Sequence, residues 1–254
     1  MSKLNQVVFH NTLRKKEVWV YLAFTLLPLL VFVTELTDTK FLRLTGDFSE
    51  MNFLDFYGTT LGIIDGMILP AIVIAYIAST MFYGEINKGI LFLYKDINRK
   101  KVMNSKVLSL MKTYGLYLLL VMLSSLVVYY FFVIQMKGGT FSLLGSVTPV
   151  TYYSVLGVLG LFGINIVAIL VAANLSVRFS TGVTVLGTIF FLFLMQAISR
   201  VDGLNYLSPM SYRELFNVGQ MTFSMSFILL VFLCVVYVVS AYTLLYRQFS
   251  KVEY

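Results

Sequence analysis

Residues 113–136 have the sequence TYGLYLLLVMLSSLVVYYFFVIQM, a run of 24 positions without a charged side chain. A helix needs about 20 mostly apolar residues to cross the hydrocarbon core of a bilayer. The whole chain has the same character, since 59% of its 254 residues are hydrophobic and only 12% are charged. In soluble domains roughly 45–50% of residues are apolar and about 25% are charged. We therefore expect an all-α integral membrane protein in which residues 1–254 form a single transmembrane domain.

The composition excludes several other classes of protein. An aromatic content of 16% excludes a disordered chain, and the single cysteine, Cys234, excludes a disulfide scaffold. A β-barrel would show short alternating segments, whereas these apolar runs are continuous. The net charge of +7 lies mostly beside the apolar runs. Membrane topology explains that charge, so we expect no nucleic-acid partner.

Six apolar runs predict six transmembrane helices. Gly138, Gly139 and Pro149 separate the third run from the fourth, because glycine and proline interrupt helices. The predicted spans are about residues 18–35, 60–84, 112–136, 151–176, 180–199 and 221–246.

Small and polar residues within these spans predict close contacts between helices. Gly157, Gly160 and Gly163 in the fourth span are typical of helices that pack at short distance. Three amide side chains are expected to form interhelical hydrogen bonds: Asn165, Asn174 and Gln196.

The distribution of lysine and arginine predicts the orientation of the spans. Fourteen of the 19 basic residues lie in the N-terminus, the second-to-third loop, the fourth-to-fifth loop and the C-terminus, and five lie in the opposite segments. Basic residues concentrate on the cytoplasmic side of a membrane. Both termini are therefore expected in the cytoplasm, which agrees with an even number of spans.

The chain lacks the side chains that most membrane enzymes need. Its one histidine, His10, precedes the first span, so a serine–histidine or cysteine–histidine pair inside the membrane is not expected. The sequence has neither a zinc-binding H-E-x-x-H motif nor a phosphate-binding G-x-x-x-x-G-K-[ST] motif. We expect that the chain is not an enzyme and holds no metal or cofactor, and that any ATP-driven work comes from a partner.

The segment 85–104, between the second and third spans, is predicted to be a cytoplasmic amphipathic helix. Ile86, Ile90, Leu93 and Ile97 recur at helical spacing and would form one apolar stripe. Such a helix either lies on the lipid surface with its lysines among the headgroups or docks into a groove on a cytoplasmic protein. The periodicity alone does not choose between these two interpretations.

The layout resembles that of the permease subunits of ABC-2-type exporters. Residues 3–16 are similar to the N-terminal elbow helix of that family, and residues 206–212 are similar to its proline-containing stretch before the last span. The second-to-third loop matches the family's spacing at five positions: Glu85, Gly89, Leu93, Arg99 and Lys106. Two positions depart from it, since Ile90 replaces a common threonine and Asp96 a common proline. The small size is similar to that of permeases of lantibiotic immunity and toxic-peptide export.

This resemblance implies a bacterial plasma-membrane protein that pairs with a second permease, either a second copy or a homologous chain. Two ATP-binding subunits would dock beneath the pair and would hold the ATP and magnesium. The resemblance assigns contacts with those subunits to eight residues: Glu85, Ile86, Gly89, Ile90, Leu93, Tyr94, Arg99 and Lys100.

The apolar character of the spans favours an apolar or amphipathic cargo, such as a peptide toxin or a hydrophobic drug, over a sugar. Candidate residues of the substrate path are Asp65, Tyr76, Phe190 and Phe193. Asp65 is either a functional charge within the membrane or a residue near the outer interface. The alternative function is an autonomous immunity or scaffold protein that binds a peptide or a membrane partner without transport.

Overall fold

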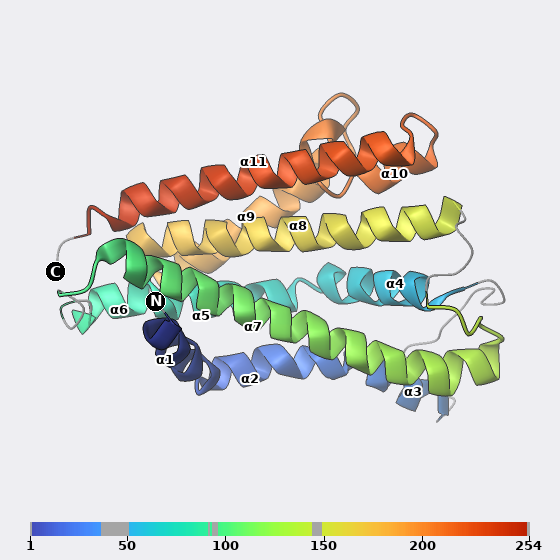
Figure 1. Ribbon diagram of the computed structural model, residues 1–254, viewed down its shortest axis with the longest axis horizontal. Coiled ribbons are helices and arrows are strands. Elements are labelled where there is room, and N and C mark those ends of the chain that lie inside the picture. The colour runs from blue at the N-terminus through green and yellow to red at the C-terminus, as the bar shows by residue number, and fades with distance from the viewer. Residues whose placement is uncertain (1, 37–50, 91, 93–95, 144–148, 253–254) are drawn as a thin grey trace.

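The computed structural model describes residues 2–36, 51–90, 92, 96–143 and 149–252, and in these residues the chain forms helices and turns but no strands (Figure 1). The long helices run side by side along the long axis of the molecule. The elements are α1 (Ser2–Leu13), α2 (Lys16–Ala23), η1 (Phe24–Leu26), α3 (Leu27–Leu36), α4 (Phe53–Gly66), α5 (Leu69–Met81), α6 (Tyr83–Asn87), α7 (Arg99–Val128), η3 (Tyr129–Lys137), α8 (Pro149–Arg178), α9 (Thr181–Ile198), η4 (Asn205–Leu207), α10 (Tyr212–Asn217) and α11 (Phe223–Phe249).

Five helical stretches in the described residues are long and apolar enough to cross a membrane. They are Leu69–Asn87, Arg99–Gln135, Pro149–Arg178, Thr181–Ile198 and Phe223–Phe249. The chain is therefore a multi-pass helical membrane protein. The predicted first span, residues 18–35, is divided among α2, η1 and α3 and is not one of these five stretches. That this segment crosses the membrane as a further span stays a prediction, and so does the orientation of the termini.

The predicted second span is not one helix. Asn52 caps α4, which begins at Phe53 and ends at Gly66, and α5 begins only at Leu69. Pro70 explains the break, because a proline inside a helix clashes with the carbonyl group four residues earlier, here that of Gly66. The residue at the break, Ile68, has a φ of 60°. Helices α4 and α5 then follow each other almost end to end (Figure 1).

The predicted helix over residues 85–104 is also wrong as a continuous helix. Helix α6 ends at Asn87, and Gly89 has a φ of +66°, a left-handed conformation that ends helices and that glycine adopts easily. A new helix, α7, begins at Arg99, where the Asn98 side chain accepts a hydrogen bond from the Lys100 backbone. Leu93 and Tyr94 lie outside the described residues.

The N-terminal helix that was predicted over residues 3–16 is present as α1, although it ends at Leu13. Lys15 is extended, with φ −70° and ψ 135°, so α1 and α2 are separate helices. Helix α1 packs against α7. Its position relative to a bilayer stays a prediction.

Helix α8 is the centre of the bundle, because it packs against α4, α5, α9, α10 and α11. Its glycines confirm the predicted close packing. A methyl group on Gly160 would lie 2.8 Å from the carbonyl oxygen of Pro209, and one on Gly163 would collide with the Cys234 sulfur. Two of the three predicted amide contacts are also confirmed. Asn165 donates to Asp65 on α4 at 2.9 Å, and Asn174 donates to the Ala241 carbonyl on α11 at 2.9 Å.

We predict that Gly160→Ala destabilises the protein by about 1–3 kcal/mol, because the added methyl group meets backbone that cannot rotate away. Replacement of glycine by alanine within a helix normally increases the stability of the helix by about 1 kcal/mol. Gly115→Ala on α7 is the matched control, since no atom lies within 4 Å of its new methyl group. Denaturant unfolding in detergent micelles measures both. Equal unfolding free energies for the two variants would contradict the packing.

Candidate functional site

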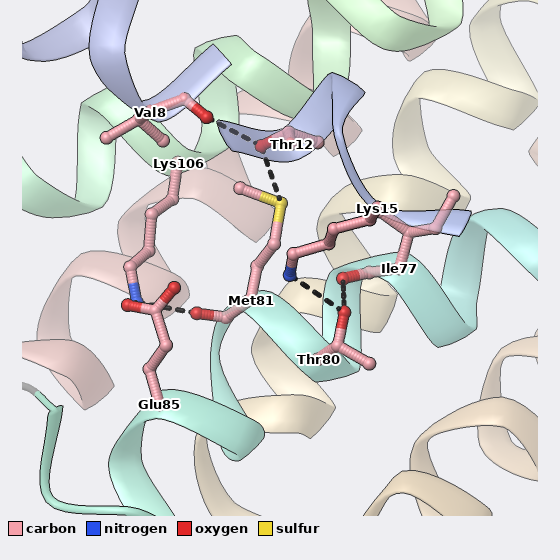
Figure 2. Close-up of polar contacts among 8 residues, drawn as sticks. All are labelled: Val8, Thr12, Lys15, Ile77, Thr80, Met81, Glu85 and Lys106. Atoms are coloured by element: carbon pink, nitrogen blue, oxygen red, sulfur yellow. Dashed lines mark hydrogen bonds and ion pairs between the residues drawn. The ribbon is translucent and has the colours of Figure 1, made fainter. Parts of the chain in front are cut away.

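Five residues from four segments meet near the junction of α5 and α6, and we call them the Lys106 hub: Thr12, Lys15, Met81, Glu85 and Lys106 (Figure 2). The side chain of Lys106 is 2% exposed. Its Nζ atom lies 2.9 Å from Oε2 of Glu85 and donates a hydrogen bond of 2.6 Å to the carbonyl oxygen of Met81. The ammonium group is thus paired on one side with a carboxylate and on another with backbone.

The local sequence explains why a carbonyl group is available to Lys106. Helix α5 ends at Met81, and the next residue, Phe82, turns the chain with φ −100° and ψ −71°. The last carbonyl groups of a helix lack partners within it and carry partial negative charge. Two aromatic rings complete the site, with Nζ of Lys106 at 5.2 Å from the Phe82 ring and 5.9 Å from the Phe249 ring. Such distances allow cation–π attraction.

Helix α1 and Lys15, in the link between α1 and α2, also join the hub. The Thr12 hydroxyl donates to the Val8 carbonyl at 2.8 Å and contacts the Met81 sulfur at 3.7 Å. Nζ of Lys15 donates to the Thr80 hydroxyl at 3.1 Å. Burial lowers the pKa of Lys15, and the nearby Glu85 carboxylate partly offsets that shift. Glu85 therefore lies between two lysines from different segments.

The structure places the predicted partner-binding residues in three different settings. Glu85 points inward to Lys106, with 23% of its side chain exposed, and Ile86 packs against the core. Arg99 donates to the Ser250 carbonyl at 2.6 Å, and Lys100 lies 5.5 Å from the Tyr246 ring. Both of these basic residues therefore contact the C-terminal part of the chain.

The outer surface of this segment contains residues from the turn after α6. Gly89 is exposed and Ile90 is half-buried. Phe92, which the periodicity did not select, is 56% exposed. The turn at Gly89 ends the helix to which Ile86 belongs, so Ile86 and Ile90 do not lie on one continuous helical stripe.

The structure brings together only two of the four predicted path residues. Asp65 and Phe193 line one cavity of about 160 Å³ between α4, α8 and α9. Tyr76 lines a separate apolar groove of about 560 Å³ between α2, α5 and α9. Phe190 lines neither of these and is 68% exposed. Asp65 lies at the end of α4, so the break in the second span determines its position.

Little in the sequence indicated the central contact of the hub. Lys106 was matched to the exporter family only by spacing, and it follows three basic residues at positions 99–101. From the sequence alone, Lys106 could not be distinguished from an exposed lysine in a loop. The start of α7 at Arg99 places Lys106 about two turns into the helix, where polar and basic residues still alternate with apolar ones.

The described residues contain no group of three or more histidine, cysteine, aspartate or glutamate side chains that could hold a metal ion. Comparison of the chain with protein-family models, with curated proteins and with solved structures gives no match. The fold and the hub define a multi-pass helical membrane protein with a rigid junction at one end of the bundle.

We predict that Glu85→Gln destabilises the protein more than Lys106→Met does, by about 3 kcal/mol against about 1 kcal/mol. Removal of the carboxylate charge leaves a buried ammonium group without its counter-ion, whereas removal of the ammonium group leaves a carboxylate that water can still reach. Denaturant unfolding in detergent measures each value. The double variant should recover most of the loss caused by Glu85→Gln. Equal losses in the two single variants would contradict this asymmetry.

Proposed function

We propose that this chain is the permease subunit of an ATP-driven exporter and moves an apolar or amphipathic substrate out of a bacterial cell. The observation that carries the proposal is the Lys106 hub. It joins α6, the first helix of the predicted cytoplasmic segment, to α5 and α7 through the contacts of Lys106 with Glu85 and Met81. Contacts of Thr12 and Lys15 add the N-terminal segment.

The hub supports a mechanical role for the segment that follows α6. A force applied to residues 86–92 moves α6, and the ion pair of Glu85 with Lys106 passes that movement to α7. Helix α5 moves with α6 because only Phe82 separates them. A surface that is to receive such a force from a partner needs apolar groups, and Phe92 supplies one.

The partner in this proposal is an ATP-binding cassette subunit, in two copies, which supplies the hydrolysis that the chain itself does not perform. A second permease completes the path. The apolar groove lined by Tyr76 faces outward between α2, α5 and α9, and α9 is only 17% buried over its apolar window. This face suits a second permease better than a polar partner.

The first test is a pull-down of the tagged chain from its native membranes in mild detergent, followed by mass spectrometry. The proposal expects an ATP-binding cassette subunit in a 1:1 ratio with the chain. Its absence under these conditions would contradict the permease function and would favour the immunity or scaffold alternative.

The second test locates the docking surface. We predict that Phe92→Asp reduces recovery of the ATP-binding subunit at least tenfold, because a carboxylate is costly to bury in an apolar contact. Phe141→Asp is the matched control, since Phe141 is 78% exposed and lies beside residues that bond to the start of α4, at the other end of the bundle. Equal recovery with both variants would place the docking surface elsewhere.

A further inference from the structure

Asp65 lies far along α4 because that helix begins earlier than the sequence predicted. It follows Phe53, the first residue of α4, by twelve positions, which corresponds to about 18 Å along the helix. Asp65 is therefore a half-buried carboxyl group at the break between α4 and α5, four residues before the apolar stretch Leu69–Asn87. A charge is costly to bury in such a position without a partner.

The Asp65 carboxyl group accepts a hydrogen bond from a side chain of α8. Nδ2 of Asn165 donates to Oδ1 of Asp65 at 2.9 Å and also to the Leu161 carbonyl at 3.0 Å. The second bond fixes the amide so that its donor, and not its oxygen, faces Asp65. Among the described residues, no lysine, arginine or histidine forms an ion pair with Asp65. The negative charge thus has a hydrogen-bond donor but no counter-ion.

Two further features make this point attractive to a cation. Asp65 is one residue from the C-terminal end of α4, where the helix dipole adds negative potential. Tyr21, Tyr114 and Tyr117 line the small cavity on one side of Asp65, and the rings of Tyr21 and Tyr117 stack with centroids 4.5 Å apart. Aromatic faces attract cations and repel anions.

The cavity on the other side of Asp65 has room for a ligand. Its volume is about 160 Å³, close to that of a cavity that binds benzene. Gly62 and Gly66 form part of its wall, and no atom lies within 4 Å of a methyl group added to either. Most of the remaining wall is apolar: Ile68, Leu161, Ile164, Ile189, Leu192, Phe193 and Met210.

Two polar side chains, Gln196 and Arg213, also line this cavity. Nε of Arg213 lies 3.4 Å from Oε1 of Glu214, and its guanidinium group lies 5.5 Å from the Tyr153 ring. An acid and an aromatic ring therefore lie beside this guanidinium group. Among the described residues that line the cavity, Asp65 supplies the negative charge.

We propose that this cavity binds a primary ammonium group carried on a small apolar body, with Asp65 as its counter-ion. The apolar walls accept the body of the ligand, and the carboxylate accepts the ammonium group. The role of this cavity as a substrate site rests on the proposed transport function. The binding itself does not, because it needs only this chain.

The test uses the full chain, purified in detergent, with n-butylammonium as the probe and n-butanol as its uncharged analogue. We expect millimolar n-butylammonium to raise the unfolding temperature of the wild type, since a ligand that binds only the folded state stabilises it. The shift should vanish in Asp65→Asn, and n-butanol should give the same small shift in both proteins. An equal shift by n-butylammonium in wild type and Asp65→Asn would overturn the proposal.

A second pair of variants decides the question even if Asp65→Asn fails to fold. Gly62→Leu keeps Asp65 and fills the cavity, whereas Gly115→Leu adds the same side chain to equally open space on α7. Leucine is a better helix former than glycine, so both variants should fold. We expect n-butylammonium to stabilise Gly115→Leu but not Gly62→Leu. Equal stabilisation of both would overturn the proposed site.

Two peptides distinguish the sources of the ammonium group. An N-acetylated amphipathic peptide with one lysine and its N-acetylated norleucine analogue, which has no ammonium group, are added in competition with n-butylammonium. Competition by the lysine peptide alone supports a peptide ligand, and competition by neither supports a free amine. Competition by both peptides equally would overturn recognition of the ammonium group. Binding that depends on Asp65, together with no ATP-binding subunit in the pull-down, would leave the site in place and remove the transport function.

Discussion

The buried ammonium group of Lys106 sets the strongest constraint on the cytoplasmic-facing end predicted for this bundle. An ammonium group removed from water is destabilising by several kcal/mol unless charges and hydrogen bonds replace its hydration. Here the replacements come from Glu85 at 2.9 Å and the Met81 carbonyl at 2.6 Å. Because they belong to α6 and α5, the need to pair one lysine of α7 fixes the relative positions of three helices. The end of α5 at Met81 is part of this arrangement, since a carbonyl inside the helix would already have a partner.

The break between α4 and α5 satisfies a second constraint, that backbone groups within a bilayer must form hydrogen bonds. The turn does this locally, since the amide groups of Met67 and Ile68 donate to the carbonyl groups of Ile64 and Asp65 at 3.2 and 3.0 Å. Pro70 has no amide hydrogen to leave unsatisfied. The chain is therefore interrupted without leaving these backbone groups unpaired, and the break places Asp65 where a continuous helix would not.

The sequence predicted the class of fold well because long apolar runs have few alternatives to membrane-spanning helices. It also predicted the close packing at the glycines of α8, since Gly160 and Gly163 occur in a helix whose other side chains are mostly apolar. It failed at the two turns, at Ile68 and at Gly89. Hydropathy does not depend on backbone dihedral angles. The residues that indicated the two turns were Pro70 and Gly89. The pairing of Glu85 with Lys106 joins different helices, which no periodicity within one segment can predict.

Helix α5 connects the two constraints. It has 13 residues, or about 20 Å of length, with the hub at its end and the Asp65 break at its start. Three of its residues, Pro70, Ala71 and Ile74, line the tyrosine-rich cavity beside Asp65. In the proposed function, the break allows α5 to move with α6 without bending a longer helix. Such a movement would shift the wall of that cavity relative to the Asp65 carboxyl group. On that proposal, α5 connects the surface around Phe92 with the cavity beside Asp65.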